Sequence, residues 1–278
     1  MVKNNRKRFD KIARDIKSIK IQGARNIAKA AFQAYSLVPT EKSIKTLLSL
    51  RPTEPMLEKV LSLVGKISNE EILKHFDSAQ KEINKNVLKI IEHKDVIFTH
   101  CHSTNVVNAL VFAKKAWKQF EVYNTETRPL FQGRRTAKEL KKAKIKVTMF
   151  IDSASAIAIG KENKKDKTYA TKILLGADAL LPNGIINKVG SGMISEIAHH
   201  HRIPVYIIAD SWKFSRKKVP IENRKLNEIW NSAPKNIQIK NPAFEFVKEK
   251  YITGIITEFG LMKYKDFVKK MKETRRGE

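Results

Sequence analysis

Reactive side chains follow the short apolar runs of this 278-residue sequence with great regularity. The runs at 96–98, 120–123, 147–151, 173–175, 205–208 and 251–256 lead into Thr99-His100-Cys101-His102-Ser103, Asn124-Thr125-Glu126-Thr127-Arg128, Asp152-Ser153, Gly176-Ala177-Asp178, Asp210-Ser211-Trp212-Lys213 and Thr257-Glu258. Ligands of open parallel sheets bind just beyond the carboxyl ends of the strands, so this pattern predicts one site at one sheet edge. Loops are polar in any case, but that alternative explains a thiol and an Asp in an apolar, buried-looking context less well.

Cys101 is the sole cysteine, so it cannot form an intramolecular disulfide or a multi-thiolate zinc site. It follows a predicted strand and precedes Ser103-Thr104, which are good caps for a following helix. A thiol at a helix N-terminus among cations is expected to have a lowered pKa and to act as acid, base or nucleophile. A free cysteine is also often a small core residue, and position alone leaves both roles open.

Two glycine-containing segments are candidates for binding phosphate. The segment 183–192 is a glycine-punctuated turn leading into a helix, and it offers backbone N–H groups and Lys188 to an anion. It matches neither the Walker A pattern nor the dinucleotide fingerprint, which argues against ATP and NAD. Gly23-Ala24-Arg25 is either a second phosphate-facing turn or a close helix contact, and the residues alone favour the contact.

The histidines do not form a metal-binding pattern. His100 and His102 alternate on a strand-like segment, so we do not expect them to share one metal ion. The run His199-His200-His201 is typical of a helix end at the surface. We therefore expect no metal and no organic cofactor.

The elements that must position these residues fall into two parts. Up to about residue 92, apolar residues recur at three- and four-residue spacing, as in Ile12, Ile16 and Ile19, which predicts helices. From residue 95 the apolar runs alternate with helical stretches, the pattern of β-α units around a parallel, doubly wound sheet. We predict a helical N-terminal domain over 1–92 and an α/β domain over 93–278 that carries the site.

Composition excludes several classes of protein. The chain is 42% hydrophobic and 30% charged, so it is neither a disordered polymer nor a collagen-like repeat. No apolar run approaches the roughly 18 residues that span a bilayer, and the basic start lacks the apolar core of a signal peptide, so we expect a cytoplasmic protein. The net charge of +27 favours phosphorylated metabolites, RNA or acidic proteins as partners. The cationic run over 134–146 is interpreted as a solvated face, and no specific nucleic-acid site is expected.

Taken together, these residues resemble the superfamily shared by ribose-1,5-bisphosphate isomerase, methylthioribose-1-phosphate isomerase and the alpha, beta and delta regulatory subunits of translation initiation factor 2B. The resemblance is carried by Thr99-His100-Cys101-His102-Ser103, Thr125-Glu126-Thr127-Arg128-Pro129 with Gln132-Gly133, Gly176-Ala177-Asp178, Asn183-Gly184 and Asn187-Lys188-Val189-Gly190. It extends from Gly23-Ala24 and Arg51-Pro52 to Asn241-Pro242-Ala243-Phe244 and Thr257-Glu258. It implies an α/β fold with a helical N-terminal domain and a Rossmann-like C-terminal domain, whose mainly parallel sheet has six or seven strands.

The resemblance also implies an activity, an aldose-ketose isomerase that converts ribose 1,5-bisphosphate to ribulose 1,5-bisphosphate, as in nucleoside or AMP salvage. Cys101 would accept and Asp178 would donate protons, because a sugar whose C1 carries phosphate cannot open its ring without the enzyme's help. The positions that match those holding the sugar phosphates are Gly23, Ala24, Arg25, Arg51, Asn187, Lys188 and Lys213. Family members form dimers or larger dimer-based assemblies, so a homo-oligomer, either a dimer or a hexamer, is expected.

One departure keeps a second function open. Where the isomerases have Arg-Gly-Ala, this chain has Gln22-Gly23-Ala24, which removes a cation unless Arg25 replaces it. Gln22-Gly23 is also similar to the delta regulatory subunit, and Glu54 brings an acid close to the presumed anion site. The alternative is a non-catalytic regulatory subunit that binds initiation factor 2. Methylthioribose-1-phosphate isomerase is less favoured because the loop at Cys101 resembles the bisphosphate enzyme, and RNA binding has charge but no recognisable module.

Overall fold

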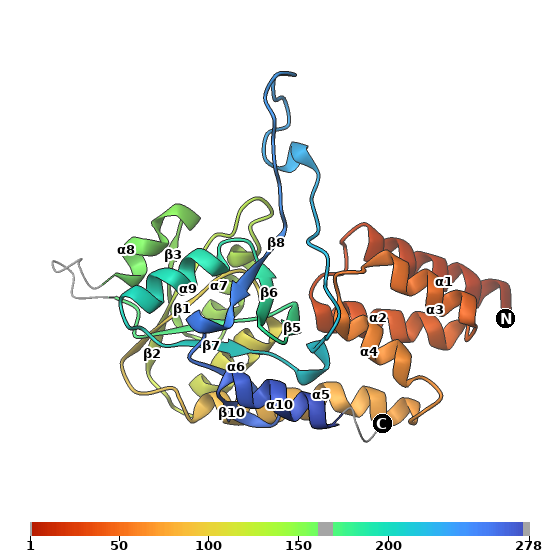
Figure 1. The fold of residues 1–278 in the computed structure, drawn as a ribbon, viewed down its shortest axis with the longest axis horizontal. Helices are drawn as coiled ribbons and strands as arrows, with labels where there is room; N and C mark the ends of the chain where they lie inside the picture. Colours follow the sequence, from red (N-terminus) through yellow and green to blue (C-terminus); the bar gives the residue numbers. More distant parts are fainter. Residues whose placement is uncertain (1, 161–168, 275–278) are drawn as a thin grey trace.

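The computed structural model describes residues 2–160 and 169–274, and its N-terminal part is a layer of helices beside an α/β body (Figure 1). The helices of this part are α1 (Val2–Lys17), α2 (Ala24–Leu37), α3 (Glu41–Leu50), α4 (Pro55–Leu63) and α5 (Asn69–Leu88). Their apolar faces enclose two small cores, one around Phe9 and Leu47 and the other around Met56 and Phe76. The helical periodicity of the sequence is confirmed.

Local signals in the sequence set the ends of these helices. The Thr40 hydroxyl accepts a hydrogen bond from Ser43 N at the start of α3, at 3.2 Å. Ser68 and Glu71 form a capping box at the start of α5. Pro55 occupies the first turn of α4, where its missing N–H would have had no partner within the helix.

The α/β body is built on a seven-stranded sheet in the order β10-β9-β7-β4-β1-β2-β3. Its strands are β1 (Asp95–Thr99), β2 (Phe120–Thr125), β3 (Lys146–Phe150), β4 (Lys172–Leu175), β7 (Val205–Ile208), β9 (Gly254–Thr257) and β10 (Gly260–Met262). All neighbours pair in parallel except β9 and β10. Each of the six predicted apolar runs contributes a strand, and the antiparallel β10 is the seventh.

Alternate residues of each strand pack on opposite faces of the sheet, which explains why the runs are apolar throughout. Phe98 and Leu175 face one core with α8 (Ser155–Ile159), α9 (Ser191–His200) and α10 (Tyr264–Thr274). Ile97 and Leu174 face the other core with α6 (Thr104–Lys115), α7 (Gln132–Lys142) and the second half of α5. The sheet is therefore doubly wound, as expected. Helix α5 contacts both the helical layer and the sheet, and a domain boundary at residue 92 stays a prediction.

A second, three-stranded antiparallel sheet stands beside the first, in the order β5-β6-β8. Its strands are β5 (Ala179–Leu181), β6 (Gly184–Lys188) and β8 (Phe244–Lys248). The prediction of a turn over 183–192 was therefore wrong for residues 184–188, which form β6. Strand β6 pairs with β5 across the short turn at Pro182 and Asn183 and with β8, which lies far along the chain, whereas the glycines of this segment had suggested one continuous turn. Turns remain at Asn183, between β5 and β6, and at Val189 and Gly190, just before α9.

Between the short helix η2 (Ser211–Lys213) and β8 the chain leaves the body as an arm, which rises above the molecule in Figure 1 and carries η3 (Leu226–Glu228). Its two sides pair near the base, where Arg224 N donates to Asn241 O and Ala243 N donates to Glu222 O, both at 2.8 Å. Glu222 and Arg224 are thereby held beside the sheet edge.

The strand order places a topological switch between β1 and β4, because the chain continues from β1 to β2 on one side and from β4 to β7 on the other. A crevice opens at such a point between two loops that leave in opposite directions. Here those loops are 100–103 after β1 and 176–178 after β4. They carry Cys101 and Asp178.

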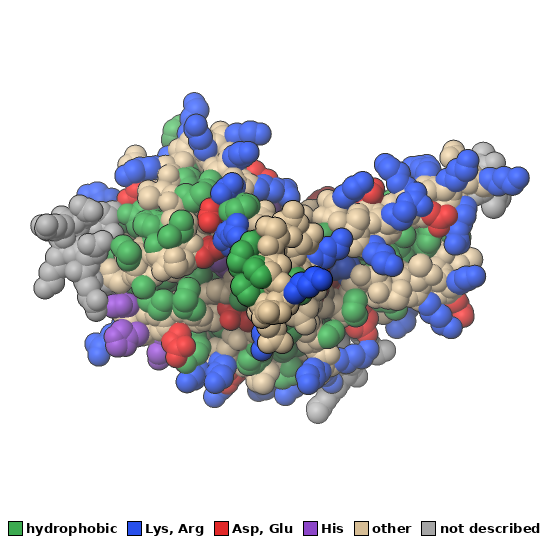
Figure 2. Space-filling view, turned by 90° about the horizontal axis from the view of Figure 1, so that it is seen from above, with side chains coloured by type: hydrophobic (Ala, Val, Ile, Leu, Met, Phe, Trp, Pro, Cys, Tyr) green, Lys and Arg blue, Asp and Glu red, His purple; other side chains and the backbone are tan. Residues whose placement is uncertain are grey.

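Cations cover both parts of the surface seen in Figure 2. The predicted solvated run is exposed at each cationic position, Arg134, Arg135, Lys138, Lys141, Lys142, Lys144 and Lys146. None of the described helices is long and apolar enough to cross a membrane.

Gly133 allows α7 to approach the end of β2 closely. A Cβ at this position would lie 1.8 Å from Thr125 O, a backbone atom that cannot move aside. We predict that Gly133→Ala lowers the free energy of unfolding by roughly 2 kcal/mol or more, as overpacking does. Gly192→Ala is the matched control, because its Cβ would meet only the flexible Glu245 carboxylate at 3.3 Å. Equal stabilities of the two variants in urea would show that the close approach is not required.

Candidate active site

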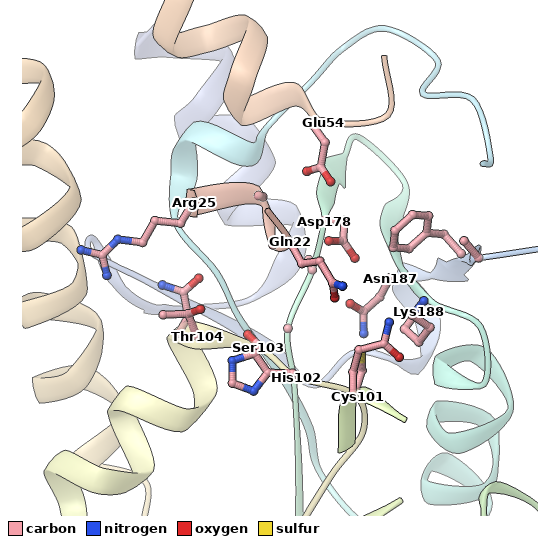
Figure 3. A pocket seen from close by; sticks show the side chains of 18 of the residues that line it. Gln22, Arg25, Glu54, Cys101, His102, Ser103, Thr104, Asp178, Asn187 and Lys188 are labelled. Carbon is pink, nitrogen blue, oxygen red and sulfur yellow. The ribbon is translucent and has the colours of Figure 1, made fainter. Parts of the chain in front are cut away.

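A cavity of about 110 Å³ lies at the switch point, between the carboxyl edge of the sheet and the helical layer. Every site residue predicted from the sequence lines it: Gly23, Ala24, Arg25, Arg51, Cys101, Asp178, Asn187, Lys188 and Lys213. Figure 3 shows Glu54, Asp178, Gln22, Asn187 and Lys188 around one space, with Cys101 at its lower end. The side chains come from both parts of the chain, so the site is closed by the packing of the helical layer on the sheet.

The loop that carries Cys101 is held by hydrogen bonds from the neighbouring strand ends. Cys101 N donates to Thr127 Oγ1 at 3.0 Å, and Thr136 Oγ1 donates to Cys101 O at 2.9 Å. The Asp152 carboxylate in turn accepts from Thr127 N and Arg128 N, at 2.9 and 2.6 Å. These contacts hold Cys101 in a left-handed backbone conformation with φ of 65°.

Of the two histidines beside the cysteine, His100 is buried and His102 is half-buried; both are hydrogen bonded, and burial lowers the pKa of both. His100 Nε2 donates to Val189 O at 2.8 Å, so its Nδ1 accepts from Thr125 Oγ1. His100 therefore links the end of β1 to the turn before α9. The pKa of His102 falls to about 4, chiefly through burial and then through Arg135, so His102 is neutral at pH 7.

The expected lowered pKa of Cys101 was wrong. Ser103 is the N-cap of α6, as predicted, and Cys101 lies two residues before it, outside the first turn of that helix. Burial raises the pKa of Cys101 to about 11, and Lys188 only partly opposes this effect. Asp178 and Asp152 add to the increase. The resting protein therefore holds a thiol rather than a thiolate.

Asp178 lies across the switch point, and burial raises its pKa as well. Lys213, Lys188 and Arg51 oppose that increase, in this order of strength. Its backbone N–H donates to Ile186 O at 2.9 Å, which ties the loop after β4 to the small sheet. The loop after β4 also contacts the loop that carries Cys101. Gly176 lies so close to Ser103 that an added Cβ would be 2.5 Å from Ser103 Oγ. Cys101 and Asp178 are thus on loops in direct contact.

Lys213 is 6% exposed, and its ammonium group donates to Ala177 O at 2.6 Å and to Asn105 Oδ1 at 3.4 Å. The helix η2 that carries it is braced from two sides. Asp210 accepts from Trp212 N at 2.9 Å, and Glu258 accepts from Ser211 N at 3.1 Å. The loops after β7 and β9 therefore position a cation at the site.

Asn187 and Lys188 end β6 and are 5% and 7% exposed. Asn187 Nδ2 donates to Ser191 Oγ at 2.8 Å, which fixes the amide against the first turn of α9. The Lys188 ammonium lies 5.0 Å from the centre of the Phe244 ring. Strand β6, rather than a glycine-rich turn, presents these two side chains to the cavity.

Gly23 has a φ of 84° and is the residue just before α2, whose N-terminus faces the cavity. The segment Gly23-Ala24 is therefore a turn at the cavity and not only a helix contact. Arg25 points away from the labelled cluster in Figure 3, and its guanidinium donates to Asp77 at 2.7 Å. Gln22 donates its amide to Ile19 O at 3.0 Å. Arg25 is therefore paired with Asp77 on α5. Gln22 supplies an amide at the position where the isomerase motif is expected to have a cation.

Several lining residues were absent from the predicted site. Glu222 and Arg224 come from the arm, and nothing in the local sequence shows that the arm folds back over the sheet edge. Thr127 and Asp152 do not line the cavity but hold the Cys101 loop from behind, and their polarity after predicted strands was the available signal. Among the described residues one trio, His75, Asp210 and Glu258, brings possible metal ligands within 4.8 Å of one another. Hydrogen bonds to η2 engage both of its carboxylates.

The fold and the site define a class: a two-part α/β protein with a buried, basic cavity at the switch point of a doubly wound sheet. A family model described as "Initiation factor 2 subunit family" matches residues 13–264. The chain belongs to this family.

Similar proteins carry the names of sugar-phosphate isomerases and of a translation initiation factor. The chain is 33% identical to the ribose 1,5-bisphosphate isomerase of Thermococcus kodakarensis over 90% of this chain and 89% of that protein. It is 31% identical to the methylthioribose-1-phosphate isomerase of Fervidobacterium nodosum, over 91% and 82% of the two chains. A solved translation initiation factor eIF-2B from Pyrococcus horikoshii superposes with a TM-score of 0.80 at 25% identity, covering 92% of this chain and 97% of that one.

The raised pKa of the half-buried Cys101 thiol predicts slow reaction with electrophiles in the resting protein. Alkylation of Cys101 by iodoacetamide at pH 7.5 should be about tenfold or more slower in the native protein than in urea, and its rate should rise about tenfold per pH unit. The chain has a single cysteine, so the reaction reports on this thiol alone. Lys188→Met should shift the profile to still higher pH because it removes the cation that favours the thiolate. A native rate that is already constant above pH 8 would contradict the assignment.

Proposed function

We propose that this protein is a sugar-phosphate isomerase that converts ribose 1,5-bisphosphate to ribulose 1,5-bisphosphate. The observation that carries the proposal is the juxtaposition of Cys101 and Asp178 on touching loops, in one buried cavity that also holds Lys188 and Lys213. Its relatives named ribose 1,5-bisphosphate isomerase support the bisphosphate as substrate.

Two proton carriers are enough for the reaction. The Cys101 thiolate takes the proton from C2 while the Asp178 carboxyl group gives its proton to the ring oxygen, and the bond from C1 to that oxygen breaks. The product of this step is an enol whose C1 still carries phosphate. Cys101 then returns a proton to C1, and Asp178 takes the proton of the C2 hydroxyl group, which becomes the ketone. No electrons or atoms are exchanged with another reactant.

The two carriers differ in how ready they are for these roles. Burial raises the pKa of Asp178, so its carboxyl group holds a proton to higher pH than an exposed aspartate does. A protonated carboxyl group suits the role of proton donor. Cys101 must first lose its proton, and Lys188 is the cation that favours the thiolate. Removal of that proton is therefore the step that limits the active fraction of the enzyme.

The phosphate groups have several candidate partners. Lys188, Lys213 and Arg51 supply charge, and Asn187 supplies an amide. The N-terminus of α2, at Gly23-Ala24, adds backbone N–H groups and the positive end of a 14-residue helix. Arg25 supports this end of the helix through Asp77 rather than by pointing at the cluster.

Turnover of ribose 1,5-bisphosphate, followed by NMR of the product, tests the proposal. We expect Cys101→Ser and Asp178→Asn each to lower kcat by about 10²–10⁴-fold, the usual contribution of a positioned acid or base. Both variants should still bind the sugar bisphosphate, because neither residue is a charged phosphate ligand. Methylthioribose 1-phosphate serves as the competing substrate, and preferential turnover of that sugar would refute the choice of substrate.

The rate should depend on pH through the thiol. Because the pKa of Cys101 is about 11, the thiolate fraction rises about tenfold per pH unit at neutral pH. We predict that kcat at saturating substrate rises between pH 6.5 and pH 8.5, with a slope near one on a logarithmic plot. A kcat that is level or falls over this range would contradict a Cys101 base.

A second function is favoured by one observation: Gln22 places an amide where the isomerase motif has a cation. The protein would then be a non-catalytic subunit that binds initiation factor 2, as the likeness to a structure titled translation initiation factor eIF-2B suggests. Measurable binding of the sugar bisphosphate with no product from the wild type would favour this alternative. Assembly into a dimer or hexamer and a cytoplasmic location remain predictions under both functions.

A further inference from the structure

One wall of the cavity brings three acidic side chains against two arginines. Arg51 Nη2 donates to Glu54 Oε1 at 3.4 Å and to Glu222 Oε2 at 2.9 Å. Arg224 pairs with Glu222 at 3.5 Å and with Glu228 at 2.6 Å. Two guanidinium groups thus face three carboxyl groups. The wall carries no net charge when Glu54 is protonated and one negative charge when Glu54 is ionised.

Buried polar atoms on this wall lack a hydrogen-bond partner. They are Arg51 Nε and Nη1, Thr53 Oγ1 and Glu54 Oε2, on side chains that are 8%, 5% and 3% exposed. Arg51 and Glu54 both line the cavity, and Figure 3 shows the Glu54 carboxyl directed toward Asp178. Unpaired donors next to an unpaired carboxyl oxygen form a site that a ligand completes.

A second part of the cavity lining, around Asp178 and called the lysine end here, has a different charge. Lys188 and Lys213 face Asp178 there, so the cations exceed the acids by one even when Asp178 is ionised. A phosphate is favoured at this end without any change of protonation. At the Arg51 wall a phosphate is repelled by an ionised Glu54 and accepts a hydrogen bond from a protonated one.

We propose that Glu54 determines which ligands the Arg51 wall admits, by carrying a proton when a phosphate group lies against Arg51 and excluding that phosphate when ionised. The proposal rests on the proposed function in taking a sugar bisphosphate as the ligand. A bisphosphate, with one phosphate at each end, then binds together with a proton. A monophosphate occupies the lysine end and needs none.

The groups around Glu54 support this assignment. Burial, with Asp178 next in importance, raises the pKa of Glu54 to about 8, and Glu222 contributes in the same direction. Arg51 and Lys213 oppose the increase. An added phosphate is a further negative charge, so it raises this pKa again. The linkage is reciprocal: a ligand that raises the pKa takes up protons near pH 8 and binds less tightly as the pH increases.

Calorimetric titration tests the proposal in the Cys101→Ser background, where the sugar stays unchanged. Ribose 1,5-bisphosphate and ribose 5-phosphate are each titrated at pH 7, 8 and 9, in buffers of different ionisation enthalpy, so that proton uptake is counted directly. We expect the bisphosphate to take up about half a proton at pH 8 and close to one proton at pH 9, and to lose about tenfold in affinity between pH 7 and pH 9. The monophosphate should show neither effect.

Glu54→Gln, a neutral isostere of the protonated acid, should abolish the proton uptake and keep bisphosphate affinity constant from pH 7 to pH 9. Glu70→Gln is the matched control, since Glu70 is exposed on α5 and should leave both measurements as they were. Equal proton uptake with and without the Glu54→Gln substitution, or no bisphosphate binding at pH 7, would overturn the proposal. If the wild type shows proton-linked binding but no turnover, the isomerase function is refuted and the role of Glu54 stands. If the wild type shows turnover but its binding of the bisphosphate is independent of pH, the role of Glu54 is refuted and the isomerase function stands.

Discussion

Burial of ionisable side chains at the carboxyl edge of the sheet is the constraint on which this structure depends. Cys101, Asp178 and Glu54 all line one cavity, and partial or full burial raises the pKa of each. An isolated charge in such a place would be costly, so acids and cations occur there together. The cavity is therefore a mixed-charge network whose protonation adjusts to its contents, which is the property that proton transfer on a charged sugar requires.

The scaffold meets this constraint by close approaches of backbone. The loops after β1 and β4 touch because residue 176 is glycine, and α7 reaches the end of β2 because residue 133 is glycine. Asp152 holds the turn at Thr127, which in turn holds the backbone of Cys101. Each reactive group is thus positioned by a neighbouring strand end rather than by its own loop. The helical layer and the arm then close the cavity from the other sides.

The sequence predicted what depends on local pattern. Five of the six apolar runs form central strands whose residues are buried on both faces, and the run at 147–151 forms the partly exposed edge strand β3. The polar segments after them converge because parallel strands end at one edge of the sheet. The sequence could not predict the pairing of β6 with β8, which lies far along the chain, or the contribution of Glu222 and Arg224 from the arm. The pKa of Cys101 was wrongly predicted for a related reason. Burial is a property of the whole fold, and it outweighs the nearby cations.

The central claim is that a sugar bisphosphate lies in this cavity with its reacting carbons between Cys101 and Asp178. A crystal structure of the Cys101→Ser protein with ribose 1,5-bisphosphate tests it most directly. The account predicts one phosphate against Lys188 and Lys213, the other against Arg51, and C2 within reach of the side chain at 101. A sugar bound elsewhere, or bound here with C1 and C2 turned away from both 101 and Asp178, would contradict it.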